Sequence, residues 1–258
     1  MRKKGTGLFR FLVFSVMLIL LGAIKPERTL AEGREYQLEL NGSWTSGEIK
    51  KNRDQDRYYF SLKQNGFLSL YVQSWSIRNL RFQVWQEGIT KAVFSGKVGK
   101  SQKYNPKTVH ENLALAAGDY YVSIKGDYSR GTYALWASFQ AYGEYEALDC
   151  GSPEKALPLE LHETVGSFLT TNAYCSFFLI RVPSRRKVTF PVKSVGKGTS
   201  LSLWTDHFIR ISRSEVRNGT MQKPGILKYM RILDPGEYYI KVNSSSTSGC
   251  IYDLTVTG

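Results

Sequence analysis

Nearly the same seven residues occur twice in the chain, as GDYYVSI at 118–124 and as GEYYIKV at 236–242. Other features recur at a similar spacing: FQVW at 82–85 corresponds to LSLW at 201–204, and Tyr133 corresponds to Tyr252. Each copy is long enough to bury a core of its own, so two copies indicate tandem domains rather than a solenoid. We expect a first domain over 32–146, a second over 150–258, and a linker near Tyr145–Pro153.

Apolar residues alternate with polar ones in short runs that end at Gly, Asn, Asp or Ser. Alternation with a period of two is typical of strands that bury one face and expose the other. The first copy contains five such runs, which are Tyr58/Phe60/Leu62, Leu68/Leu70/Val72, Leu80/Phe82/Val84, Tyr120/Val122/Ile124 and Tyr133/Leu135/Ala137/Phe139. The pattern predicts an all-β chain of two tandem antiparallel β-sandwich domains.

The repeated phrase can be read position by position. Gly118 and Gly236 are expected at tight turns where a Cβ is unwelcome. The first Tyr and the following aliphatic residues should point inward, which leaves Tyr121 and Tyr239 pointing outward.

The N-terminal segment has the layout of a secretory signal peptide. Basic residues begin it, an apolar run follows from Phe11 to Ile24, and small residues at Thr29 and Ala31 suit cleavage after Ala31. We therefore expect residues 1–31 to be a signal and the protein to be secreted or associated with the cell surface. The open alternative is an uncleaved N-terminal anchor. No second long apolar stretch follows, so no stable membrane span is expected after cleavage.

The order of motifs resembles the bacterial pre-peptidase C-terminal domain. The first copy contains Gly47-Glu48-Ile49, Asp56-Arg57-Tyr58-Tyr59-Phe60, Gly66-Phe67-Leu68-Ser69-Leu70, Leu115 to Val122 and Gly131-Thr132-Tyr133-Ala134-Leu135. The second copy is looser, with Cys175 aligned to Asp56 and Lys187 aligned to Phe67, but it keeps Leu233 to Ile240 and Tyr252-Asp253-Leu254. The resemblance covers nearly all of the chain after residue 31.

This resemblance implies a jelly-roll-like sandwich, a fold usually appended to exported enzymes as an accessory or substrate-binding module. Collagen-binding relatives bind calcium through acidic residues near the start of the domain. The corresponding acidic residues here are Glu32, Glu35 and Glu39, or Glu154 and Glu160, with no dense Asp/Asn loop. No cofactor is expected, and calcium is kept as the minor alternative.

All three cysteines, Cys150, Cys175 and Cys250, lie in the second copy. An exported chain can form disulfides, and an odd count leaves one thiol over. A Cys175–Cys250 bridge is preferred over one that involves Cys150, although the sequence does not decide between them. No close Cys/His pair is present, so no metal site is predicted.

Catalytic chemistry has little support in the residues. The three histidines are His110, expected in a polar loop, His162 and His207; neither a Gly-x-Ser-x-Gly elbow nor a His-Glu-x-x-His motif is present. Asp54 and Asp56 precede a strand, and a turn role explains them better than acid–base catalysis. We therefore predict a protein that is not an enzyme, while an unrecognised site remains the third alternative.

Outward aromatic residues are the main candidates for binding. Tyr71, Trp136, Trp44 and Trp75 have no aromatic counterpart in the second copy, whereas Tyr59, Trp85 and Tyr121 do. Flat rings bind sugars or peptides at low entropic cost. We therefore expect candidate ligand-binding residues at Tyr71, Trp136, Trp44, Trp75 and Trp85. The competing interpretation is that these rings pack against the linker or the other domain.

The formal net charge of +13 favours anionic partners outside the cell, although solubility alone also explains it. Basic residues form no run longer than Arg185-Arg186-Lys187, so nucleic acid is not expected as a partner. The sequence predicts extracellular binding of a glycan or protein surface, led by the first domain. The alternative is a structural or accessory subunit that stabilises a separately encoded exported enzyme.

Overall fold

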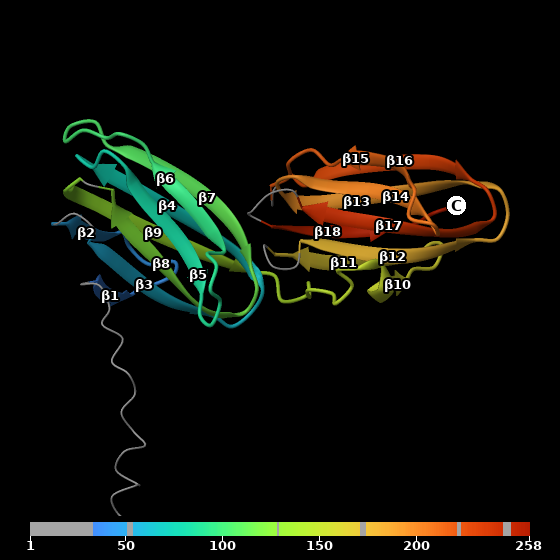
Figure 1. Ribbon diagram of the computed structural model, residues 1–258, viewed down its shortest axis with the longest axis horizontal. Coiled ribbons are helices and arrows are strands. Elements are labelled where there is room, and N and C mark those ends of the chain that lie inside the picture. Colours follow the sequence, from blue (N-terminus) through green and yellow to red (C-terminus); the bar gives the residue numbers. More distant parts are fainter. Residues whose placement is uncertain (1–32, 51–53, 128, 171–173, 221–222, 245–248) are drawn as a thin grey trace, which may run out of the picture. The chain divides into compact units, whose positions relative to one another are not determined.

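The structure is a computed structural model that describes residues 33–50, 54–127, 129–170, 174–220, 223–244 and 249–258 (Figure 1). The predicted signal, 1–31, lies outside the described residues. Strands make up almost all of the regular structure, and the one helical element is a short 3₁₀ turn, η1 (Pro153–Lys155), within the described part. In that part of the chain, no helix is long and apolar enough to cross a membrane.

Nine strands form the first sandwich, in two sheets (Figure 1). A five-stranded sheet has the order β1-β3-β8-β5-β6 and a four-stranded sheet has the order β2-β9-β4-β7. The strands are β1 (Gly33–Gln37), β2 (Thr45–Ile49), β3 (Gln55–Leu62), β4 (Gly66–Trp75), β5 (Leu80–Gln86), β6 (Phe94–Val98), β7 (Lys107–Leu115), β8 (Gly118–Gly126) and β9 (Gly131–Ala141).

The second sandwich repeats this order strand for strand. Its sheets are β10-β12-β17-β14-β15 and β11-β18-β13-β16. The strands are β10 (Leu157–Pro158), β11 (Thr164–Leu169), β12 (Cys175–Val182), β13 (Arg186–Gly196), β14 (Thr199–Thr205), β15 (Arg210–Glu215), β16 (Gly225–Leu233), β17 (Gly236–Ser244) and β18 (Cys250–Thr255). Identical topology in both copies confirms the tandem β-sandwich fold expected from the repeat.

The sheets are antiparallel except at one edge of each sandwich. The edge strand β1 pairs with β3 in parallel, with Tyr36 opposite Tyr58, and β10 pairs with β12 in parallel. Parallel pairing was not expected from the alternating pattern. It is possible here because a strand of the other sheet lies between the two paired strands along the chain, β2 in the first sandwich and β11 in the second. This intervening strand supplies the long crossover that parallel strands require.

The core of the first sandwich contains the inward side chains that the alternation predicted. In the first sandwich, all five predicted runs lie in one buried cluster, with Phe139 packed partly buried against it. The repeated glycines have left-handed backbone, with φ of 148° at Gly118 and 157° at Gly236. A side chain is disfavoured there, which explains why the phrase keeps glycine in both copies.

One strand of the second copy is shifted by a residue from the sequence alignment. Phe178, Ile180 and Val182 point into the core, whereas the alignment of Cys175 with Asp56 places Phe177 and Leu179 at the inward positions of Tyr58 and Phe60. The strand registers place Cys175 opposite Asn243, as Gln55 is opposite Lys125 in the first copy. Ser176, and not Cys175, is therefore the counterpart of Asp56.

A third cluster contains side chains of both sandwiches, which together form the single compact unit Gly33–Gly258. Phe67 and Ala114 come from the first sandwich, and Phe168 and Ile251 from the second. The ring centroids of Phe67 and Phe168 lie 6.4 Å apart in an edge-to-face arrangement. Tyr142 and Tyr145, near the predicted linker, pack against this cluster.

Candidate functional site: an aromatic row on the first sandwich

Four aromatic rings lie in one row across the outer face of the sheet β2-β9-β4-β7. Tyr71 on β4 is the direct cross-strand partner of Trp136 on β9 and of His110 on β7. Trp44, immediately before β2, completes the row beside Trp136. Because successive side chains of a strand alternate between faces, the odd positions of β4 point away from the core and carry Tyr71 outward. We call Trp44, Trp136, Tyr71 and His110 the aromatic row.

The rings of the row contact one another. Tyr71 stacks on His110 with centroids 4.0 Å apart and planes 7° from parallel. Tyr71 and Trp136 are 5.1 Å apart, and Trp136 and Trp44 are 6.4 Å apart. The side chain of Trp44 is 46% exposed, His110 is exposed, and the two central rings are half-buried. Centroid distances of about 4.5–7 Å are typical of favourable aromatic pairs, so the row is a self-supporting apolar surface.

Hydrogen bonds fix the tryptophan end of the row. The Trp136 indole Nε1 donates to the Gly42 carbonyl at 2.9 Å. Asn41, which has a φ of 63°, accepts a hydrogen bond from the Phe139 backbone N–H through its side-chain oxygen at 2.9 Å. The segment before β2 is thereby attached to β9, and this attachment keeps Trp44 next to Trp136.

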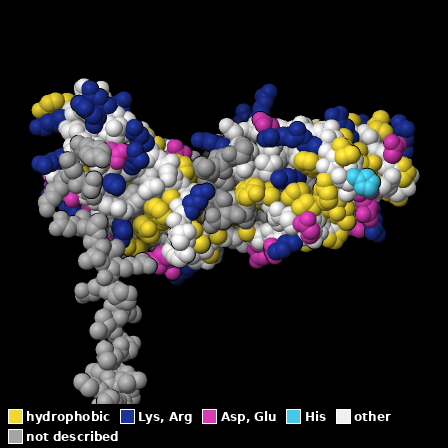
Figure 2. Space-filling model, in the orientation of Figure 1, with side chains coloured by type: hydrophobic (Ala, Val, Ile, Leu, Met, Phe, Trp, Pro, Cys, Tyr) yellow, Lys and Arg dark blue, Asp and Glu magenta, His cyan; other side chains and the backbone are white. Residues whose placement is uncertain are grey.

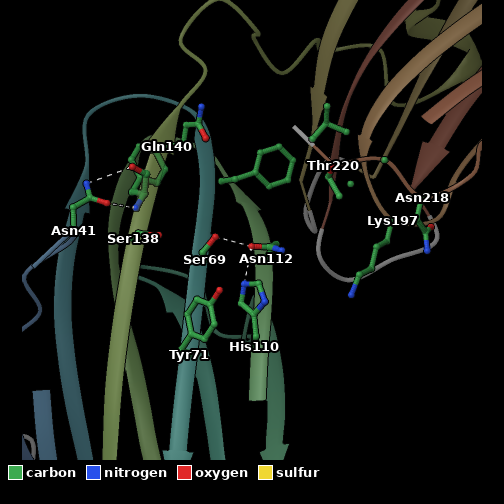
Figure 3. A pocket seen from close by; sticks show the side chains of 15 residues that line it. Asn41, Ser69, Tyr71, His110, Asn112, Ser138, Gln140, Lys197, Asn218 and Thr220 are labelled. Carbon is green, nitrogen blue, oxygen red and sulfur yellow. Dashed lines mark hydrogen bonds between the residues drawn. The ribbon is translucent and has the colours of Figure 1, made fainter. Parts of the chain in front are cut away.

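The histidine end of the row continues into a pocket of about 740 Å³ (Figure 3). On the first sandwich, Tyr71, His110, Ser69, Asn112, Ser138 and Gln140 line it. Asn112 Oδ1 accepts from Ser69 Oγ at 2.6 Å and lies 3.1 Å from His110 Nε2. On the second sandwich, the segments around Lys197 and Asn218 line the pocket, and Figure 3 shows Lys197, Asn218 and Thr220 across from Tyr71 and His110. Flat rings thus meet amide and hydroxyl groups at one site.

The second copy does not reproduce the row. The registers place Thr164, Thr255, Pro191 and Lys228 where the first copy has Trp44, Trp136, Tyr71 and His110. The offset of 119 residues that matches Tyr133 to Tyr252 also matches Trp44 to Glu163, one residue away from its structural counterpart Thr164. The expectation that His110 lies in a polar loop is wrong, because His110 lies in β7 and corresponds to Lys228 in β16.

The other aromatic candidates lie elsewhere. Trp75 is at the end of β4, four residues beyond Tyr71, and lines a shallow pocket of about 770 Å³ with Arg34, Tyr36 and Lys103. Trp85 is on the outer face of the other sheet, where its ring stacks on Tyr121 at 6.1 Å. The second copy has Trp204 and Tyr239 as cross-strand partners at these positions, with Phe208 stacked on Tyr239. The Trp85 cluster therefore belongs to the shared fold.

Asp56 is not in a turn, as the sequence had suggested, but in β3, and its side chain is 1% exposed. Arg34 reaches it from β1, with Nε and Nη2 at 2.9 and 3.0 Å from the two carboxylate oxygens. Tyr133 Oη also donates to Asp56, and Tyr58 Oη is 2.8 Å from Tyr133 Oη. Burial raises the pKa of Tyr58 to about 12 and also raises that of Tyr133. This buried network is structural. Asp54 comes directly before β3, and its carboxylate accepts a hydrogen bond from the Lys50 N–H.

The three cysteines are free thiols in the structure, and all three are buried. The expected Cys175–Cys250 bridge is not formed. Cys175 Sγ donates to the Gly151 carbonyl at 3.3 Å, while Cys250 pairs with Leu169 and Gly196 across neighbouring strands. Burial raises the pKa of both thiols, which makes them poor nucleophiles.

No group of three or more His, Cys, Asp or Glu side chains that could hold a metal ion occurs among the described residues. Of the acidic residues considered for calcium, Glu35 accepts hydrogen bonds from Tyr59 Oη and from Arg57. Glu154 lies in η1, and Glu32 is outside the described residues.

Comparisons with known proteins give similarities of fold. No protein-family model and no curated protein sequence matches this sequence. Among solved structures, the pre-peptidase C-terminal domain of a Bacillus anthracis collagenase is 18% identical, with a TM-score of 0.34, and covers 41% of this chain and 98% of its own. This is the family that the sequence resembles.

Two further solved structures extend these similarities. PliG of Aeromonas hydrophila, a periplasmic inhibitor of g-type lysozyme, is 15% identical, with a TM-score of 0.29, over 42% of this chain and 99% of its own. The exported protein XepA of PBSX is 9% identical, with a TM-score of 0.24, over 83% of this chain and 86% of its own. All of these TM-scores are below 0.5, so none of these likenesses assigns a function to the chain.

Proposed function

We propose that this chain is a secreted, non-catalytic binding protein whose first domain binds a glycan on the aromatic row. The observation that carries this proposal is the row itself: Trp44, Trp136, Tyr71 and His110 cross one sheet face in a line, and their polar neighbours Ser69 and Asn112 border it. The apolar face of a sugar ring stacks on an aromatic ring, while its hydroxyls need donors and acceptors close by. The row and its polar border offer both.

Three further features support binding rather than a role in packing alone. The row stands on strands of a rigid sheet, which preorganises the rings. Asn112 and His110 are exposed, so their polar atoms are accessible to a ligand. The second copy folds in the same way with Thr164, Thr255, Pro191 and Lys228 in these places, so the fold does not require the rings.

The test is a glycan array probed with the wild-type chain and with single variants. Trp136→Ala removes the ring that contacts both Trp44 and Tyr71. Stacking of a nucleobase on an aromatic ring is worth about 1–3 kcal/mol, and with the same range for a sugar ring the affinity for the positive glycans should fall roughly 5- to 150-fold.

Trp85→Ala is the matched control, because it removes a half-buried tryptophan from the outer face of the other sheet. It should leave glycan binding unchanged. Binding that falls equally in both variants, or an array without any positive glycan, would contradict the proposal. Co-purification of one stoichiometric exported enzyme in place of glycan binding would favour the accessory-subunit alternative.

A further inference from the structure

The second sandwich presents an apolar and basic surface on the sheet face that corresponds to the aromatic row. Figure 2 shows hydrophobic side chains (yellow) among Lys and Arg side chains (dark blue) on the second sandwich. The edge strand β16 directs Ile226, Met230 and Ile232 outward, and their side chains are 65%, 47% and 66% exposed. Their inward neighbours Tyr229 and Leu233 are buried in the core, which establishes the outward direction of the even positions. Large exposed apolar side chains at three of the four outward positions of one strand are unusual on a protein surface.

Lysines alternate with these apolar side chains. On the neighbouring strand β13, Lys193 is the register partner of Ile226 and Lys187 is the partner of Ile232. Lys228 lies on β16 itself, between Ile226 and Met230, opposite Pro191. All three lysines are exposed, and none forms an ion pair with a residue in the described ranges. We call Ile226, Met230, Ile232, Lys187, Lys193 and Lys228 the Ile–Lys face.

The first copy has no such combination. The corresponding strand β7 carries Thr108, Asn112 and Ala114 where β16 has Ile226, Met230 and Ile232. Two of the lysines, Lys193 and Lys228, correspond to Gln73 and His110. Because both copies fold with the same strand order, the fold does not demand aliphatic side chains or lysines at these positions. The Ile–Lys face therefore calls for an explanation outside the folding of its own domain.

We infer that the Ile–Lys face docks onto a lipid surface with anionic headgroups. Aliphatic side chains enter the boundary between headgroups and acyl chains, and lysines keep their charged ends at the phosphates while their stems lie along the apolar surface. Each lysine near an anionic leaflet adds attraction that salt screens. The face supplies both parts of this interaction on neighbouring strands.

Two other occupants fit the surface less well. A second copy of this chain, packed face to face, would bring the same lysines against one another. A soluble polyanion would pair with the lysines but would leave Ile226, Met230 and Ile232 in water, so it would not use their apolar area. An anionic lipid surface complements the charged and the apolar residues together.

The test is sedimentation of the chain from Gly33 onward with vesicles, because residues 33–258 form one compact unit and residues 1–31 carry an apolar run of their own. Vesicles contain either phosphatidylcholine alone or phosphatidylcholine mixed with phosphatidylglycerol. We expect the chain to sediment with the mixed vesicles, less so at high salt, and much less with neutral vesicles.

Two triple variants separate the parts of the face. K187E/K193E/K228E and I226S/M230S/I232S should each weaken binding to mixed vesicles by at least roughly tenfold. The matched control K97E/K100E/K125E makes the same charge change with exposed lysines of the first domain and should bind as the wild type does. Circular dichroism verifies that every variant is folded.

Heparin serves as the soluble polyanion. Binding to heparin should survive I226S/M230S/I232S, because this variant keeps the lysines. If that variant also sediments with mixed vesicles as the wild type does, the apolar residues have no role and the face is a polyanion site, which overturns the inference. Equal loss in the first-domain control, or equal sedimentation with neutral vesicles, would overturn it as well.

Discussion

Substitution of Asp56 is the sharpest test of what holds the first sandwich together. Its carboxylate is 1% exposed and accepts hydrogen bonds from Arg34 and Tyr133. Asp56→Asn keeps the shape, removes the charge, and places an N–H₂ group where an acceptor is needed. Hydrogen bonds to a charged group contribute about 1.5–3 kcal/mol each. The Arg34 side chain is 42% exposed, so water can hydrate its guanidinium after the substitution. The free energy that the Arg34–Asp56 pair contributes is therefore smaller than that of a fully buried pair.

The expected loss in free energy of unfolding is therefore about 2–4 kcal/mol, which is near the lower end of the range measured when one partner of a buried ion pair is removed. Urea unfolding followed by tryptophan fluorescence measures it well, because four of the five tryptophans, Trp44, Trp75, Trp85 and Trp136, belong to the first copy. The exposed Asp119→Asn is the control, for which a change within about 0.5 kcal/mol is expected. A loss below about 1 kcal/mol for Asp56→Asn would refute the conclusion that this buried network is structural.

Alkaline pH should destabilise the fold, because Tyr58 keeps its proton to a pKa of about 12 in the folded chain, whereas an unfolded tyrosine releases it near 10. The stabilisation is complete below pH 10 and is lost between pH 10 and pH 12, by up to about 3 kcal/mol. The urea midpoint of unfolding, measured across this pH range, should fall less steeply for Tyr58→Phe than for the wild type. The thiols offer a second test: with all three cysteines buried and free, a colorimetric thiol reagent should react with none in the native chain and with all three in denaturant. A titre of one thiol in denaturant would instead show a disulfide.

The alternation of apolar and polar residues predicted the buried strands well, because a strand whose sheet has one buried and one solvent-exposed face must alternate in this way. The alternation did not reveal β7, because Lys107 to Asn112 are almost all polar and are typical of a loop. An edge strand needs few apolar residues, since it has a neighbouring strand on one side only. The alternation also missed β16, where Ile226 and Ile232 interrupt it by pointing outward. The Asp56 network was hidden because Arg34 is 22 residues away and reaches it through parallel pairing.

The aromatic row was partly predictable. Strand parity marked Tyr71 and Trp136 as outward, and comparison of the copies marked them as unmatched. The sequence did not show that they are direct cross-strand partners, because register depends on pairing between β4 and β9, which are far apart in the chain. It also did not include His110, whose strand was not recognised. No local pattern marks His110, because β5 and β6 separate β4 from β7 along the chain and the two strands do not form a hairpin.

The direction of the aromatic row has a consequence for ligand length. The four residues come from four neighbouring strands or their ends, so the row runs across the strands, and strand spacing gives it a span of roughly 14 Å. A single small ring covers one step of that span. Under the proposed function, affinity for an extended glycan should therefore rise with each added sugar unit until the row is covered and then level off.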